Sequence, residues 1–261
     1  MNLFALRGTL DKRTQFVLEV LGVLCLLALW GLVCLVGIAP PTLLPAPWEV
    51  LAAVPDLHFK DAMMRNLGYS MYLNFSGYIE AVLICIPVGF VIGLFPFFKG
   101  LFGRQVDAIR FIPLTAITGL FIVWFGIEDT MKIQFLSFGI IVYLLPVVIQ
   151  RVAQTETVYQ QTAFTLGATT WQTIRTVFFP SVFSKLFDDI RVLVAISWTY
   201  IIVAEMVNKT GGVGAMLYSA ARQSRIDKVF ALLFLIVLVG FIQDKVFKML
   251  DRKLFPYKHV S

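Results

Sequence analysis

The sequence has few of the residues that soluble enzymes use for chemistry. Charged residues make up only 15% of its 261 positions, and hydrophobic residues make up 59%, against roughly 25% and 45–50% in soluble domains. The two histidines, His58 and His259, lie far apart in the chain, which argues against a histidine-based metal centre and against a Ser/His/Asp or Cys/His catalytic set. These shortages exclude an ordinary soluble enzyme and favour an integral membrane protein.

Other motifs are missing as well. Cys25, Cys34 and Cys85 each lie within an apolar run, so we interpret them as small buried hydrophobic residues and not as a disulfide framework or metal site. No G-x-x-x-x-G-K-[ST] motif occurs, so the chain does not hold ATP phosphates by that loop. The Gly211–Gly214 segment is no substitute, because no strand precedes it. We expect no cofactor on this chain.

Long apolar runs are what the sequence does contain. A helix needs about 20 mostly apolar residues to cross the hydrocarbon core of a membrane. Six runs meet or approach this length and predict an all-α integral membrane protein, a single domain over residues 1–261. They are Phe16–Ile38, Tyr69–Phe95, Ile109–Phe125, Lys132–Gln150, Ile190–Met206 and Val229–Leu250.

Two features of these runs need comment. Pro87, Gly89 and Gly93 fall in the second run and Pro146 in the fourth, but neighbouring helices can satisfy backbone groups freed at such positions. Arg7 and other basic residues precede the first run, as in a signal peptide. That run is too long for a signal peptide, and no small-residue cleavage site follows it.

The lysines and arginines indicate how the chain crosses the membrane. With the N-terminus inside, 15 of the 22 fall on the side of both termini and of the 151–190 loop. The other seven are Lys60, Arg65, Lys132, Lys209, Arg222, Arg225 and Lys228. The positive-inside rule therefore predicts cytoplasmic termini and a cytoplasmic loop. This bias explains the net charge of +6 without a nucleic-acid partner.

The loop at 151–190 predicts two short helices joined by a turn. Thr157 with Gln160, and Thr169 with Gln172, each fit a capping box, and Gly167 lies between them, where glycine ends helices. Pro180 is expected to close the second helix. Such a loop either presents an apolar stripe to a partner or packs on the ends of its own spans, and the pattern alone favours neither.

The loop also resembles a known motif. Permease subunits of bacterial ABC importers carry E-A-A, three residues, Gly, nine residues and I-x-L-P. Here the pattern appears as Gln161-Thr162-Ala163, then Gly167, then Val177 to Pro180, with its spacing intact. The departures are Gln at 161, Thr at 162 and apolar exchanges before Pro180. LLPAPWEVLAAV, IVWFGI, TLGATTWQT, VAEM and GGVGAMLYSAARQSRIDKVFA extend the resemblance to the nitrate/sulfonate/bicarbonate/taurine subfamily, which includes importers of thiamine-pyrimidine precursors.

The resemblance implies a type I ABC importer permease in the bacterial inner membrane. It implies alternating access in a homodimer, two separate ATPase subunits that bind ATP and Mg, a periplasmic or lipoprotein substrate-binding protein and surrounding membrane lipid. The loop would be the coupling helix at the ATPase, and the residues expected to couple are Gln161, Ala163, Leu166, Gly167, Trp171, Gln172, Arg175 and Pro180. The leading substrate class is a small oxyanion or organosulfonate, and a pyrimidine precursor is the alternative.

Polar residues inside the spans are the candidates for the translocation pathway, because such residues usually face protein or water. The candidates are Ser197, Trp198, Thr199, Tyr200, Glu205, Arg110 and Thr115. For Glu205 the alternative is structural: it would cap local backbone amides or pair with Arg222 or Arg225. We expect Glu80 to form a hydrogen bond between helices, and Asp188 and Asp189 to complement the dipole at a helix start.

Two other classes of function stay open. A secondary transporter usually shows two repeated halves with broken helices, and no repeat is evident. An intramembrane enzyme would need clustered His, Asp or Glu at one membrane face, and no such cluster is visible.

Overall fold

The computed structural model describes residues 11–259, apart from the side chain of His259, and every regular element in that range is a helix. Arg7 lies outside the described residues. The elements are α1 (Lys12–Leu35), α2 (Pro47–Phe59), α3 (Met63–Leu94), α4 (Pro96–Ile109), η1 (Leu114–Ile117), α5 (Thr118–Phe125), α6 (Asp129–Ala153), α7 (Thr157–Thr165), α8 (Thr170–Thr173), η2 (Ile174–Phe178), α9 (Phe179–Val207), α10 (Val213–Arg222), α11 (Ile226–Leu254) and η3 (Pro256–His259).

Five helical segments in the described range are long and apolar enough to cross a membrane. They are α1, α3, α6, α11 and the continuous segment Thr170–Val207 that contains α9. The number rises to six if α4 and the η1–α5 segment count as one bent span. The expected all-helical membrane architecture is therefore confirmed, and α3 and α6 run on through Pro87 and Pro146 without ending.

The third expected span, Ile109–Phe125, is wrong as a single helix. Helix α4 ends at Ile109, helix resumes at Leu114, and the two pieces meet at 91°. Pro113 explains the break, because it has no backbone N–H and disfavours helical conformation in the residue before it. The fifth span, expected from Ile190, also begins much earlier, since helix runs without interruption from Thr170.

The core lies where α3, α6 and α9 cross. Leu73 from α3, Ile140 and Leu144 from α6, and Leu186 and Ile201 from α9 are fully buried there. Small residues let the backbones approach, as is usual between membrane helices. A Cβ atom at Gly77 would lie 2.8 Å from the carbonyl oxygen of Ile133 on α6.

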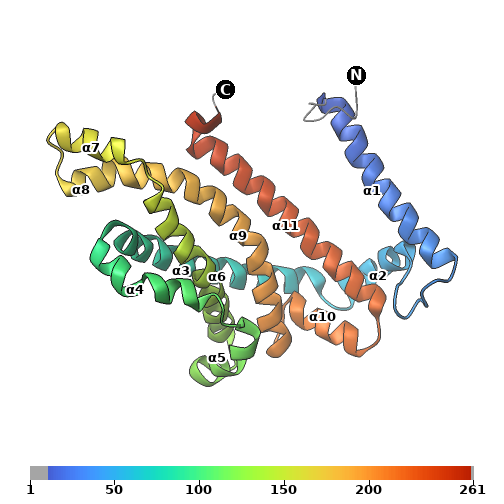
Figure 1. Ribbon diagram of the computed structural model, residues 1–261. Coiled ribbons are helices and arrows are strands. Elements are labelled where there is room, and N and C mark those ends of the chain that lie inside the picture. Colours follow the sequence, from blue (N-terminus) through green and yellow to red (C-terminus); the bar gives the residue numbers. More distant parts are fainter. Residues whose placement is uncertain (1–10, 260–261) are drawn as a thin grey trace.

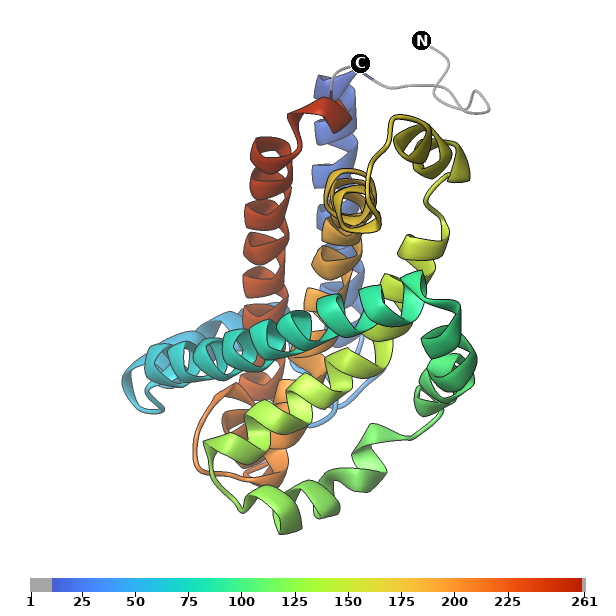
Figure 2. The same cartoon turned by 90° about the vertical axis from the view of Figure 1, so that its left-hand side faces the viewer.

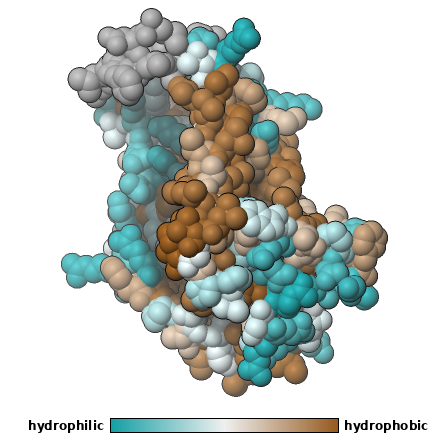
Figure 3. Space-filling model, turned by 90° about the vertical axis from the view of Figure 1, so that its right-hand side faces the viewer, coloured by the Kyte–Doolittle hydropathy of each residue, from teal (hydrophilic) through white to brown (hydrophobic). Residues whose placement is uncertain are grey.

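Helix α1 lies apart from this core. Figure 3 shows it as a hydrophobic column running down one side of the molecule, and its most apolar stretch contains no buried residue. It is held near its end, where the Trp30 ring stacks on Phe230 and Phe234 of α11 and the Trp30 indole donates to the Pro45 carbonyl. Cys25 is accordingly exposed, contrary to the burial expected for it.

The two ends of the bundle differ in what they present. Helices α7 and α8 lie at the end of the bundle where α11 finishes and α1 starts, whereas α5 and α10 lie at the opposite end (Figures 1 and 2). Helix α9 runs from the first end to the second, so one continuous helix joins the α7–α8 segment to the turn before α10.

Candidate functional site

The segment from α7 to α8 is a helix-turn-helix, as expected. Gly167 lies in the turn with φ +79°, where a side chain would be strained, and the Ala168 N–H donates to the Ala163 carbonyl to close the end of α7. The capping box expected at Thr157 is wrong, because Thr157 is already helical and Glu156 precedes the helix without a side-chain cap. The box at Thr169 and Gln172 is confirmed.

The second helix of this segment does not end at Pro180, which corrects that expectation. Pro180 lies in the first turn of α9, and α8 passes into α9 through the wide turn η2. In that turn the Phe179 N–H bonds to the carbonyl of Ile174, five residues back. Pro180 has no N–H and its ring needs the space of the Thr176 carbonyl, so the helix widens there without breaking.

Large apolar side chains on this segment face outward. Leu166 is 81% exposed and Trp171 is 70% exposed. Gln161, Gly167, Gln172, Arg175 and Pro180 are also exposed, and Ala163 is half-buried. Seven of the eight residues predicted to couple are thus exposed, and all eight lie between α7 and the first turn of α9.

Beneath the segment, its inner face meets the corner between α3 and α4. A cavity of about 250 Å³ lies between them, lined by Phe95 from the corner, by Phe164 from α7 and by Phe178 from η2. The segment therefore rests on two supports: it is continuous with α9 and it packs beside the α3–α4 corner.

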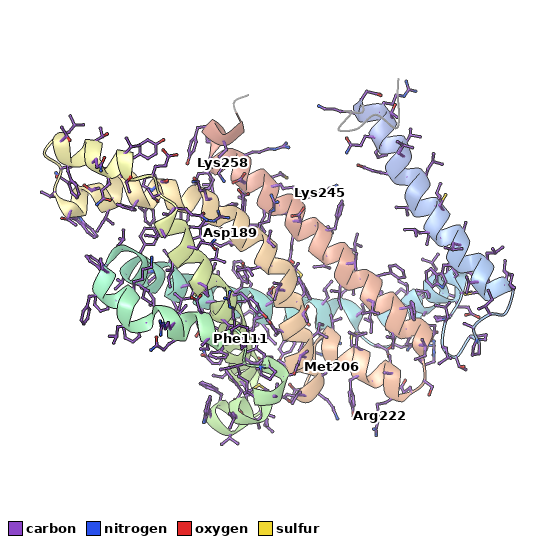
Figure 4. The ribbon with its side chains drawn as sticks, viewed as in Figure 1. Phe111, Asp189, Met206, Arg222, Lys245 and Lys258 are labelled. Carbon is purple, nitrogen blue, oxygen red and sulfur yellow. The ribbon has the colours of Figure 1, made fainter. Side chains whose placement is uncertain are left out.

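Ion pairs join the helices at this same end. Arg151 on α6 binds both carboxylate oxygens of Asp189 on α9, at 2.6 and 2.8 Å. The Lys258 ammonium lies 3.2 Å from Asp188, and Figure 4 shows Asp189 and Lys258 at the upper end of the bundle. Asp188 and Asp189 lie well inside α9 and not at its start, so the helix-dipole interpretation is wrong and their role is to link helices.

The pathway candidates on α9 divide into two groups. Ser197 and Trp198 are buried, and their polar groups already have hydrogen-bond partners within the protomer. The Ser197 hydroxyl donates to Asn74, and the Trp198 indole donates to Gln243 of α11. Thr199 is exposed on the protomer, and Tyr200 is half-buried with its ring stacked on that of Tyr143. Only the second group offers polar atoms to a surface that the protomer leaves open.

Arg110 and Thr115 lie elsewhere. Both are exposed, Arg110 where α4 ends and Thr115 in η1. The neighbours of Thr115 in η1, Leu114 and Ile117, belong to an apolar cluster against which Tyr200 of α9 also packs. The expected position of Arg110 and Thr115 within a straight span is corrected together with that span. Glu80 behaves as expected, since its carboxylate accepts two hydrogen bonds from Gln134 and so ties α3 to α6.

Glu205 is fully buried near the end of α9. One carboxylate oxygen accepts the Ser70 hydroxyl at 2.6 Å, and the other accepts the Gly214 N–H at 2.8 Å. The Ser70 oxygen in turn accepts the Val213 N–H. This is the capping alternative: the carboxylate binds the N-terminus of α10, and Arg225 pairs with Asp227 instead.

Next to Glu205 lies a cluster that the sequence does not reveal. Lys132 is completely buried, and its ammonium donates to the Tyr69 hydroxyl at 3.1 Å and to the Thr210 hydroxyl at 2.8 Å. The Tyr69 hydroxyl also hydrogen-bonds to Asp129. Tyr69, Lys132 and Thr210 are more than 60 positions apart from one another, so no local pattern could have identified the cluster. Among the described residues, no group of three or more His, Cys, Asp or Glu could hold a metal ion.

These features define the class of protein. It is a helical membrane protein with an accessible helix-turn-helix at one end, and at the opposite end polar side chains hold α10 to α3 and α9 by hydrogen bonds. Residues 85–256 match the family described as "Binding-protein-dependent transport system inner membrane component", and the chain belongs to this family. Its function therefore lies in ATP-driven transport as a membrane component and not in catalysis of its own.

Relatives of known type span nearly the whole chain. The taurine transport system permease protein TauC of Escherichia coli (strain K12) is 28% identical over 259 residues, which cover 96% of this chain and 92% of that protein. The putative aliphatic sulfonates transport permease protein SsuC of Bacillus subtilis (strain 168) is 24% identical, covering 90% and 85%. The formylaminopyrimidine transport permease protein ThiX of Halalkalibacterium halodurans is 24% identical, covering 95% and 98%.

Solved structures share the fold. An inward-facing structure of the MetNI methionine ABC transporter superposes with a TM-score of 0.67 at 17% identity, covering 74% of this chain and 98% of that chain. An amino acid ABC transporter solved with histidines gives 0.58 at 16% identity, covering 78% and 97%. The importer-permease fold predicted from the resemblance is thus confirmed.

Proposed function

We propose that this chain forms the translocation pathway of an ATP-driven importer for taurine or a related small sulfonate, and that ATPase subunits act on it through the α7–α8 segment. One observation carries the coupling part of the proposal. The exposed Leu166 and Trp171 lie on an element that is continuous with α9. A push on this element therefore moves a membrane-spanning helix directly.

The segment suits a protein partner that alternates between two positions. Its exposed apolar side chains are of the type that anchor interfaces, and its shape is fixed internally by the capping box at Thr169 and the turn at Gly167. A segment of fixed shape transmits a displacement to α9 better than a flexible loop does. Motion of α9 against α3 and α6 would open the pathway alternately to each side, a rigid-body switch.

A homodimer completes the pathway in this proposal. The chain supplies one α7–α8 segment, and the face of α9 that carries Val192, Thr199 and Met206 is exposed on the protomer. Thr199 is polar and lies within a membrane-spanning segment, where an exposed hydroxyl is better placed against protein or water than against lipid. A second copy related by a two-fold axis would place two such faces opposite each other.

The substrate class rests on the relatives. TauC and SsuC are named for taurine and aliphatic sulfonates, and both align with most of this chain. ThiX keeps a formylaminopyrimidine as the second candidate, since it aligns with 95% of the chain. We place the termini and the α7–α8 segment in the cytoplasm of a bacterium, following the excess of Lys and Arg at that side.

The first test is reconstitution. The tagged chain is purified from native membranes with its ATPase and substrate-binding protein, placed in proteoliposomes, and supplied with ATP. Uptake of radiolabelled taurine or an alkanesulfonate, dependent on ATP and on the binding protein, is the expected result. Uptake of a formylaminopyrimidine alone would replace the substrate class, and recovery of the chain with no ATPase in any detergent would overturn the importer proposal.

The second test addresses the coupling segment. Gly167→Val places a β-branched side chain at φ +79°, where such residues are strongly disfavoured, so we expect the turn to distort and transport to fall at least about tenfold. Gly240→Val is the matched control, because the space around Gly240 on α11 is open. Normal transport and normal stimulated ATP hydrolysis in Gly167→Val would exclude coupling through this turn.

A further inference from the structure

A second hollow lies at the end of the bundle opposite the α7–α8 segment. It has a volume of about 490 Å³ and lies between α2, the start of α3, α10 and the start of α11. Its charged or aromatic lining residues are Asp61, Lys209, Tyr218, Arg222 and Lys228. Arg222 projects at the lower edge of α10 in Figure 4, away from the core.

The cations of this hollow are not all neutralised. The Lys228 ammonium is buried and lies 2.5 Å from the Asp61 carboxylate, which satisfies both. Lys209 and Arg222 are exposed, and in the described part of the chain neither forms an ion pair. The hollow is thus lined by one ion pair, Asp61 with Lys228, and by two positive side chains that have no ion-pair partner in the described residues.

Both of these cations lie close to the Tyr218 ring. The Lys209 ammonium lies 3.9 Å from the ring centroid and the Arg222 guanidinium lies 5.8 Å from it. The pKa of Tyr218 lies below its usual value, first because of a hydrogen bond with Lys209 and then because of the charge of Arg222. An aromatic ring flanked by Arg and Lys is a composition typical of the anchoring points of protein interfaces.

Two other cations near this end, Lys60 and Arg225, have acidic partners. Lys60 pairs with Asp56 at 2.8 Å, and Arg225 pairs with Asp227 at 2.7 Å. Arg65, at the start of α3, is exposed and forms no ion pair in the described part of the chain, but it does not line this hollow. Within the hollow, the unpaired positive charge is that of Lys209 and Arg222. This charge attracts a carboxylate, and the hollow, at about 490 Å³, has room for an acidic side chain.

The hollow is mechanically connected to the membrane helices. The start of α10 is held by three backbone N–H groups: Gly212 donates to Asn66 at 2.9 Å, Val213 donates to Ser70 at 2.8 Å, and Gly214 donates to Glu205 at 2.8 Å. Asn66 and Ser70 belong to α3 and Glu205 belongs to α9. A partner seated against α10 thus acts directly on α9, the helix that begins in the α7–α8 segment.

We propose that the Lys209–Tyr218–Arg222 hollow is the docking point for an acidic side chain on the substrate-binding protein of this transporter. The inference rests on the proposed function, in which this end of the bundle faces the outer side of the membrane. It adds which residues contact the binding protein and the type of side chain that they bind. Each protomer of a dimer would offer one such hollow.

The test measures binding of the purified binding protein to the complete complex in nanodiscs. Lys209→Glu and Arg222→Glu are each expected to raise the Kd at least about tenfold, and more at low salt, because they set like charges opposite each other. Lys60→Glu is the matched control at the same end, outside the hollow, and we expect its Kd within about twofold of wild type. An Asp or Glu to Lys change on the binding protein should restore binding to Lys209→Glu and not to wild type.

Three results would overturn the proposal: unchanged Kd values in Lys209→Glu and Arg222→Glu, an equal loss in Lys60→Glu, or displacement of the binding protein by free taurine, which would make the hollow a solute site. The ATPase subunit is quantified in every preparation. A complex that contains ATPase but binds no acidic partner here contradicts only the docking point, whereas a wild-type chain without ATPase contradicts the proposed function.

Discussion

A buried carboxylate such as Glu205 needs several hydrogen bonds to be tolerated, because burial removes it from water. Ser70 and Gly214 supply two, at 2.6 and 2.8 Å, and the buried Lys132 adds a nearby positive charge. With its oxygens engaged and its side chain fully buried, Glu205 is placed to hold α10 on α9. At the scale of the residue, these contacts favour a structural role for Glu205 over a position on the surface of the translocation pathway.

Two substitutions separate fastening from a charge requirement. Glu205→Ala leaves the Gly214 N–H and the Ser70 hydroxyl without their partner, so we expect a loss of about 1–3 kcal/mol in unfolding free energy. Glu205→Gln can accept the Gly214 N–H with its amide oxygen, while its NH2 group donates to the Ser70 oxygen in place of accepting from it. It should therefore transport nearly as well as wild type. Melting temperature in detergent and uptake in proteoliposomes measure the two effects. The exposed Glu128→Ala is the control, and a Glu205→Gln protein with wild-type melting but no uptake would restore the pathway interpretation.

At the scale of the element, the crossing of α3 and α6 sets the bundle. At Gly77 the backbone of α6 comes close to α3, and the helices are further linked by the Glu80–Gln134 hydrogen bonds. Gly68 is in the same helix with open space around it. The two glycines therefore differ in packing and not in helix membership, which makes them a matched pair.

We expect Gly77→Ala to destabilise the protein by about 1–3 kcal/mol, since the added methyl group must push α6 away. Gly68→Ala should be neutral or stabilising by up to about 1 kcal/mol, because alanine favours helix more than glycine does. Thermal unfolding of both variants in the same detergent checks this. Equal melting temperatures of the two variants would contradict this, because they would show that α6 can move away from α3 without a loss of stability.

The elements that could be predicted from sequence are those that hydropathy determines. The runs containing α1, α3, α6 and α11 were identified with boundaries shifted by a few residues, because lipid requires an apolar length and little else. The break at Pro113 and the continuation of α9 back to Thr170 were missed. The break at Pro113 lies within a short apolar run, so hydropathy alone does not indicate the turn. Helix α9 extends back from its apolar stretch through polar residues such as Lys185, which hydropathy does not assign to a span.

The candidate site shows the same division. Gly167 and the Thr169–Gln172 box are local signals, and the structure places them as the sequence predicts. Ser70 and Glu205 meet across 135 positions, and only the folded topology brings them together. For the same reason Ser197 and Trp198, chosen for polarity alone, are buried in contacts with other helices.

At the scale of the whole molecule, one helix connects two functional ends. The segment Thr170–Val207 carries the α7–α8 element at its start and receives α10 through Glu205 at its finish. The ion pairs of Arg151 with Asp189 and of Lys258 with Asp188 hold its first half to α6 and to the segment after α11. Binding at either end can therefore bias the same rigid element, which is the physical requirement for coupling two sites.

This arrangement works only if the two ends face different compartments, which single-cysteine labelling can test. Cys25, Cys34 and Cys85 are first replaced by alanine, and then Lys60→Cys at the α10 end or Tyr159→Cys on α7 is introduced, both exposed positions. A membrane-impermeant maleimide should label Lys60→Cys in intact cells and Tyr159→Cys only after lysis, because the excess of Lys and Arg keeps the α7–α8 end inside. Labelling of both in intact cells, or the reverse order, would contradict this orientation and with it the access of cytoplasmic ATPase subunits to Trp171.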